Sequence, residues 1–169
     1  MSRLVPGSRR ALLVAALSCL WLPLVLAQDH IGELRAQFDH ETDPVRKAKA
    51  LPKLGDAQFS QLRKETDAGH YVEALKIAAE YRDEVKAAEA ALKASGLDAE
   101  RRPAGFKQLQ IHVRKSVREV EQTVLALPDE QRPPFEAIRQ ELAAIEKELI
   151  EMLFPRQPRK NSSQEEKKG

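Results

Sequence analysis

The chain has 169 residues, with 28 Lys and Arg against 26 Asp and Glu, a formal net charge of +2. Three of the basic residues and none of the acidic ones precede residue 28, so the rest of the chain carries 25 basic and 26 acidic residues, a net charge of −1. This balance gives no overall field for a nucleic acid, and nucleic-acid binding is not expected. The single cysteine, Cys19, excludes an internal disulfide and a thiolate metal site.

The N-terminal segment has the layout of a secretory signal peptide. Arg3, Arg9 and Arg10 precede an apolar run of 17 residues, 11–27, which ends in Val-Leu-Ala. A basic start, an apolar core and a small residue at the end predict cleavage between Ala27 and Gln28. Residues 1–27 are therefore expected to be removed, and the mature chain to be periplasmic or secreted by a bacterium.

Two alternatives to this reading stay open. Seventeen apolar residues are at the lower limit for crossing a bilayer, so an uncleaved anchor is the alternative to cleavage. The Ser8-Arg9-Arg10 segment is similar to a twin-arginine export motif, although the Leu-rich core favours the general pathway. With cleavage, no membrane span is expected in the mature chain.

Beyond residue 28, apolar residues recur every three or four positions and no segment alternates with period two, which predicts an all-α fold. Three segments come first: a short helix around residues 31–38, a second from residue 44 to about 66, and a third at 71–94. Asp43 should cap the second helix, with Pro44 in its first turn. Pro52 and Gly55 predict a kink or break in it.

Two further helices follow a loop at 101–105 and have the clearest amphipathic pattern. Their apolar residues form one stripe on each helix and predict an antiparallel hairpin. The first stripe is Phe106, Leu109, Val113, Val117, Val120, Val124 and Leu127, and the second is Phe135, Ile138, Leu142, Ile145, Leu149 and Met152. We expect four to five helices in one domain, 28–154, forming an antiparallel bundle or a helical-hairpin array. Residues 155–169 are polar and aperiodic, which predicts a disordered tail.

The sequence offers no motif for catalysis, a cofactor or a metal. His30, His40, His70 and His112 lack a second histidine at ligand spacing, and His112 is predicted to lie at the edge of the apolar stripe. The densest group of ligand types, residues 39–43, reads as a solvated turn. No catalytic residue, cofactor, metal or small-molecule substrate is predicted. An enzyme would need a site assembled from distant residues.

Residues 69–75, Gly-His-Tyr-Val-Glu-Ala-Leu, resemble the turn of a tetratricopeptide repeat. In that family a small Gly and Ala let two helices approach and an aromatic ring fills the groove between them. The resemblance assigns these roles to Gly69, Ala74 and Tyr71. It covers seven residues and no second copy is present, so it implies one hairpin of this kind and not a repeat array.

Residues 54–58, Leu-Gly-Asp-Ala-Gln, and 127–131, Leu-Pro-Asp-Glu-Gln, share the pattern Leu-x-Asp-x-Gln. They resemble the paired Leu-Thr-x-x-Gln motifs of small periplasmic stress chaperones, which are all-helical cradle-shaped dimers. Gly55 and Pro128 replace the motif Thr, which normally caps a helix. The pattern is also ordinary chemistry for a helix start, and both segments are predicted to begin helices.

Taken together, these patterns favour an exported, non-catalytic module that binds another protein or itself through its helical faces. The long stripes are typical of helical partners or self-association. The alternative is a periplasmic holdase-type chaperone, which requires an exposed apolar surface. The enzyme with a site built from distant residues is the third possibility.

Overall fold

The structure is a computed structural model that describes residues 22–155, with side chains described from residue 30 onward. This part of the chain is all-α and contains no strand. Its helices are α2 (Leu22–His40), α3 (Pro44–Asp67), α4 (Tyr71–Ala94), α5 (Ala104–Ala126), the short 3-10 helix η1 (Asp129–Gln131) and α6 (Arg132–Leu153). The predicted tail, apart from Pro155, and residues 1–21 of the predicted signal peptide lie outside the described residues.

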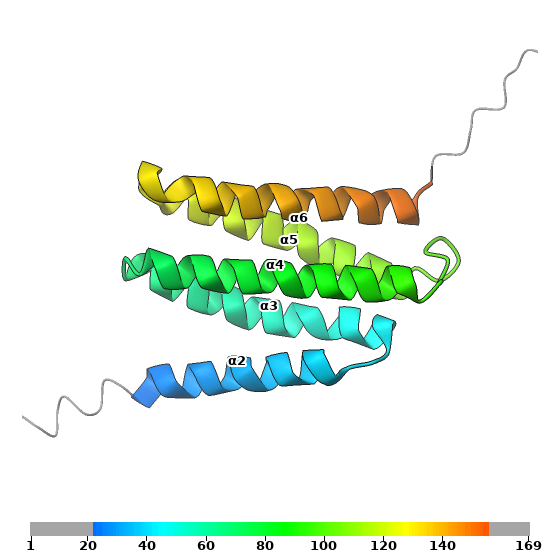
Figure 1. The fold of residues 1–169 in the computed structure, drawn as a ribbon, viewed down its shortest axis with the longest axis horizontal. Coiled ribbons are helices and arrows are strands. Elements are labelled where there is room, and N and C mark those ends of the chain that lie inside the picture. The colour runs from blue at the N-terminus through cyan, green and yellow to red at the C-terminus, as the bar shows by residue number, and fades with distance from the viewer. Residues whose placement is uncertain (1–21, 156–169) are drawn as a thin grey trace, which may run out of the picture.

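The helices form a two-layered array of antiparallel hairpins. Helices α2, α4 and α6 run side by side in one layer, and α3 and α5 lie behind them (Figure 1). Each rear helix contacts front helices: α3 packs on α2 and α4, and α5 packs on α6 and α4. The two rear helices also pack on each other, as do α4 and α6. Of the two predicted arrangements, the hairpin array describes this packing.

Local signals set the helix ends where the sequence predicts them. The Asp43 side chain accepts a hydrogen bond of 2.7 Å from the Arg46 backbone N–H, and Pro44 occupies the first turn of α3. Both hairpin turns that follow contain a glycine with positive φ, 76° at Gly69 and 68° at Gly96. Only glycine adopts this conformation without strain, so these residues end α3 and α4.

Of the predicted kink or break within α3, the break was wrong, because the helix is continuous through Pro52 and Gly55. Pro52 has no N–H to donate, so one intrahelical hydrogen bond is missing. The neighbouring Ala48, Leu51 and Leu54 are fully buried, and their packing outweighs that loss. Residues 54–58 consequently lie in the middle of a helix and do not begin one.

The predicted loop at 101–105 is two residues too long. Helix α5 begins at Ala104, and Gly105 is buried in its first turn. A Cβ at Gly105 would lie 2.8 Å from Leu92 Cδ2 and 3.3 Å from the Val45 Cα. A missing side chain therefore lets the start of α5 approach α3 and α4, a requirement that local sequence does not reveal.

The apolar stripes meet inside the array and form its core. The stripes of α5 and α6 are buried apart from Val117, Val124 and Met152, which are half-buried. The stripe of α4 is buried from Ala74 to Leu92, with the largest buried side chain at Tyr81. The stripes predicted to seek a partner are therefore used mainly within the monomer.

Candidate interaction site

Helix α6 carries a second, shorter apolar row beside its core stripe, on the flank that adjoins α5. Ala143 and Ile150 are half-buried, and Phe154, just past the helix, is 72% exposed. These residues lie seven and four positions apart, so they share one side of the helix. They line a groove with a volume of about 710 Å³, here called the outer groove, whose lining is Ala143, Glu146, Lys147, Ile150, Glu151 and Phe154.

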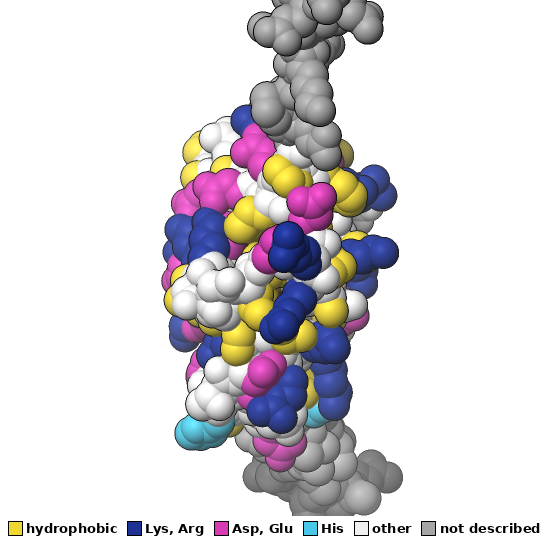
Figure 2. Space-filling model, turned by 90° about the vertical axis from the view of Figure 1, so that its right-hand side faces the viewer, with side chains coloured by type: hydrophobic (Ala, Val, Ile, Leu, Met, Phe, Trp, Pro, Cys, Tyr) yellow, Lys and Arg dark blue, Asp and Glu magenta, His cyan; other side chains and the backbone are white. Residues whose placement is uncertain are grey.

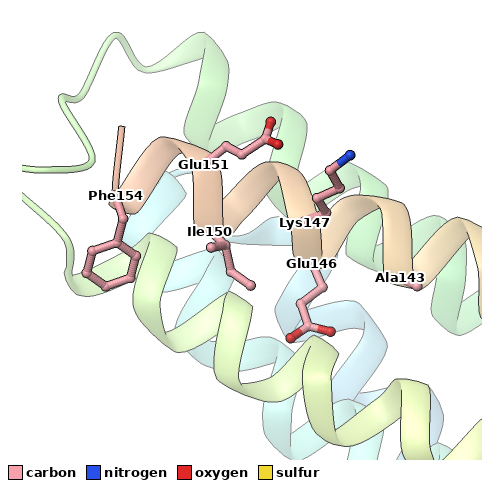
Figure 3. Close-up of a pocket in the computed structure, with 6 residues that line it drawn as sticks. All are labelled: Ala143, Glu146, Lys147, Ile150, Glu151 and Phe154. Atoms are coloured by element: carbon pink, nitrogen blue, oxygen red, sulfur yellow. The ribbon is translucent and has the colours of Figure 1, made fainter. Parts of the chain in front are cut away.

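The floor of the outer groove reaches toward α5. Glu146 and Ile150 extend toward α5, whereas Lys147 and Glu151 point away from it (Figure 3). Glu146 accepts hydrogen bonds from Arg114, at 2.6 Å, and from Gln110, at 3.3 Å. Phe154 also lines an adjoining hollow of about 550 Å³ together with Pro103 and Lys107 of the α5 start. One exposed ring thus joins two hollows along the last hairpin.

A buried polar cluster links α3, α4 and α5 in the core. The Ser116 hydroxyl donates to the His112 backbone carbonyl at 2.9 Å, so the hydroxyl of Tyr81 is the donor in its hydrogen bond to the Ser116 oxygen. Burial raises the pKa of the Tyr81 hydroxyl above its ordinary value, and the Ser116 contact opposes this rise. Tyr81 and Ser116 are each 1% exposed, so neither can touch a molecule in solution without an opening of the core.

The prediction for His112 was wrong: the side chain is 5% exposed, and its ring lies within the core. Its Nε2 has no hydrogen-bond partner within the described residues. The ring packs edge-on to Tyr81 with 5.9 Å between centroids and fills the space left by Gly55. Burial lowers the pKa of His112 to about 4, so the imidazole is neutral at pH 7.

An ion-pair cluster ties α2 to the rest of the array. Arg35 of α2 donates to Glu84 at 2.8 Å and to Glu80 at 2.7 Å, both on α4. Glu84 is 8% exposed, and burial raises its pKa, against the opposing effects of Arg35 and the nearby Gln58 amide. Arg35 and Gln58 also line a groove of about 390 Å³ between α2, α3 and α4.

Loss of this ion-pair cluster should destabilise the fold. Replacing Arg35 by Met leaves the Glu84 carboxylate without its cation, and we expect the free energy of unfolding at pH 7 to fall by about 1 kcal/mol. Urea denaturation followed by circular dichroism measures the change. Adding Glu84→Gln removes the uncompensated charge and should restore most of the loss. An equal or larger loss in the double variant would contradict this account.

The residues singled out from sequence occupy three separate places. Ala27 and Gln28, which flank the predicted cleavage point, lie within helix α2. Gly69 has open space around it, so its positive φ, and not a close approach of helices, explains the glycine there. Tyr71 is half-buried at the start of α4, and Ala74 is fully buried. In the second Leu-x-Asp-x-Gln segment, η1 leads directly into α6.

The other histidines and the acidic turn form no larger cluster. His70 Nδ1 lies 2.9 Å from Glu65 Oε2 on the surface. In the turn at 39–43, Glu41 accepts from the Asp43 N–H at 2.9 Å. Among the residues that the structure describes, no three His, Cys, Asp or Glu side chains are grouped so as to hold a metal ion.

Sequence reasoning missed the outer groove and the polar cluster for different reasons. Ala143, Ile150 and Phe154 have helical spacing that could have revealed a second row, but the stronger core stripe of α6 masked it. The approach of His112, Tyr81 and Gly55 joins three helices and has no local signal.

Comparison with models of protein families, with curated proteins and with solved structures finds no match to this chain. None of the helices within residues 22–155 combines the length and the apolar character that crossing a bilayer requires. Proposals about function therefore depend on the geometry of the chain itself.

Proposed function

We propose that the chain is an exported, non-catalytic helical module that binds a protein partner through the outer groove. The observation that supports this is the row formed by Ala143, Ile150 and the 72% exposed Phe154 on the last helix of the array. In arrays of stacked helices an outer face that ends the stack is usually polar. An apolar row at this position is what a further helix would cover.

The shape of the groove favours a helix of a partner as the occupant. From Ala143 to Phe154 the row extends over about 16 Å, or three helical turns. Its apolar floor is flanked by the outward-pointing Lys147 and Glu151 (Figure 3). An amphipathic helix places apolar side chains at three- and four-residue spacing into such a groove, and its polar edges meet the charged rim.

Site-specific crosslinking in the exporting cell tests this proposal. A photo-crosslinking amino acid at position 154 should capture one discrete protein partner, and Ile150→Asp should abolish that product by placing a charge in the apolar contact. The measurement is the crosslinked band after purification from the exporting bacterium. The intact mass of the purified protein also reports whether it begins at Gln28.

Val72 is the matched control because it is a large apolar residue, 79% exposed, at the opposite end of the array. The same crosslinker at position 72 should give no discrete product. Equal products from positions 72 and 154, or a product that survives Ile150→Asp in a folded protein, would contradict the role of the outer groove. A product at twice the mass of the chain would identify the partner as a second copy.

The holdase-type chaperone remains a second candidate with weaker support. Its exposed apolar surface cannot be the long stripes of α5 and α6, because these lie mainly in the core. The outer groove would have to supply that surface. Suppression of aggregation of an unfolding client at near-equal ratio, lost in Ile150→Asp, would favour this candidate over a specific partner.

A further inference from the structure

The near-neutral charge of the chain conceals a separation of charge between its two layers. Helices α3 and α5 together contain ten Lys and Arg and five Asp and Glu, a net charge of +5. Helices α2, α4 and α6 together contain eight basic and thirteen acidic residues, a net charge of −5. The array is therefore an electrical dipole across its thickness.

The cations of the rear layer lie on its outer surface. Two cross-helix ion pairs, Lys115 to Asp56 at 2.8 Å and Arg63 to Glu119 at 2.7 Å, show that the exposed sides of α3 and α5 adjoin. Lys and Arg side chains line the right-hand edge of Figure 2, the side of this layer. The basic face is defined as the exposed Lys49, Lys53, Lys107, Arg114, Lys115 and Arg118.

Most of these cations are not neutralised by neighbours. Within residues 30–155, Lys49, Lys53, Lys107 and Arg118 form no salt bridge, whereas Lys115 and Arg114 each have one. Among the acidic residues of these five helices, thirteen lie in the other layer and five in α3 and α5. The basic face thus presents unpaired positive charge over two parallel helices.

An apolar side chain stands among these cations. Ile111 is 52% exposed and borders a shallow hollow together with Arg114, Lys115 and Arg118. Leu125 is 74% exposed on the same helix, about 21 Å further along. Cations in rows with isolated apolar side chains between them suit the interface of a bilayer, where headgroups and acyl chains lie at adjacent depths.

We propose that the basic face binds the surface of a bilayer containing anionic lipid. Each Lys or Arg near such a surface contributes attraction, and the opposite, acidic layer is repelled, so the charge separation fixes which side faces the membrane. An acidic protein would also attract the cations, and soluble polyglutamate tests that alternative. This inference rests on the proposed export, which would bring the chain to a membrane surface.

Vesicle flotation measures the binding of the protein purified after export, in the processed form that the proposed cleavage after Ala27 leaves. It should bind phosphatidylcholine vesicles with about 20% phosphatidylglycerol at about 0.1 M salt, and about 0.5 M salt should release it. The double variant Lys49→Glu/Lys53→Glu should reduce the partition coefficient at least about tenfold. The control Lys76→Glu/Lys86→Glu makes the same charge change on exposed residues of α4 and should retain most of the binding.

Tryptophan fluorescence locates the contact. Trp21 is the only tryptophan of the chain and precedes the proposed cleavage point, so the processed protein gives a background without one. In that background Ile111→Trp should show a blue shift on addition of the anionic vesicles, because the indole enters the interface. Val72→Trp, at a more exposed apolar position of the other layer, should show none.

Several results would overturn the proposal. Equal losses in the two charge-reversal pairs, or equal blue shifts at positions 111 and 72, would show that the basic face is not the contact. Binding that persists in Lys49→Glu/Lys53→Glu but disappears in Arg156→Gln/Arg159→Gln/Lys160→Gln would assign it to the C-terminal segment. Preference for soluble polyglutamate over anionic vesicles would point to an acidic protein instead.

Discussion

Replacing Gly55 by Ala should destabilise the protein by about 1–3 kcal/mol, although alanine is the better helix former. The new Cβ would lie 2.5 Å from His112 Nε2 and 2.8 Å from Tyr81 Cε2. Neither ring can retreat easily: Tyr81 is 1% exposed, bonded to Ser116 and packed on Phe59 with 4.8 Å between centroids. The overpacking therefore exceeds the propensity gain of about 1 kcal/mol.

Urea denaturation at pH 7 gives the change directly, and Gly32→Ala is the matched control. Gly32 also lies within a helix, but apart from its chain neighbours and its own helix backbone no atom comes within 4 Å of the position its Cβ would take. That substitution should stabilise the protein by up to about 1 kcal/mol. Opposite signs for the two substitutions would separate close packing from helix propensity.

A double variant tests whether His112 is the source of the strain. Adding His112→Ala to Gly55→Ala removes the ring that the new Cβ would contact. The free energy of unfolding should therefore fall less in the double variant than the sum of the losses in the two single variants. Strict additivity, or a stabilising effect of Gly55→Ala alone, would mean that the two helices separate easily and that Gly55 is not a packing requirement.

The features that the sequence predicts correctly are those determined by residues close together along the chain. The Asp43 cap and the first-turn Pro44 each act within a few residues, and the structure confirms them. The core stripes likewise follow from helical spacing. For this reason the sequence predicts the α-helical type and the order of the elements.

The features that sequence missed depend on which helices meet. Gly55 reads as a helix breaker until His112 and Tyr81 of two other helices are known to fill the space beside it. Gly105 reads as a loop residue until Leu92 is placed against it. Pro52 is tolerated because Leu51 and Leu54 of the same helix are buried in the core. In each case tertiary packing reverses the local preference.

The same distinction applies to the candidate sites. The net charge of the chain says nothing of the two layers, because α3 and α5 are not adjacent in sequence yet carry the excess of cations together. The outer groove depends on α6 being the last helix of the array. The two surfaces involve largely different residues, so changes at Ile150 and at Lys49 should affect partner and lipid binding separately.

His112 should make the protein less stable in acid by about 3 kcal/mol between pH 7 and pH 4. Burial holds its pKa at about 4 in the folded chain. In the unfolded chain the imidazole regains its ordinary pKa of about 6.5 and takes up a proton first. The unfolded state therefore binds more protons across this window, and stability falls as the pH is lowered from about 6.5 toward 4.

Two buried carboxyls oppose this trend and set the design of the measurement. Burial raises the pKa of Glu84 and of Glu89, so their part of the stability is greatest at low pH and is lost as the pH rises through their folded-state values. Urea denaturation of the unmodified chain and of His112→Gln, at pH 7 and pH 4, isolates the histidine because both proteins retain the carboxyls. The acid loss should be smaller by about 3 kcal/mol in His112→Gln. The control His40→Gln, at an exposed position, should lose as much stability in acid as the unmodified chain. If His112→Gln also lost as much as the unmodified chain, the His112 ring would not be buried in the folded protein.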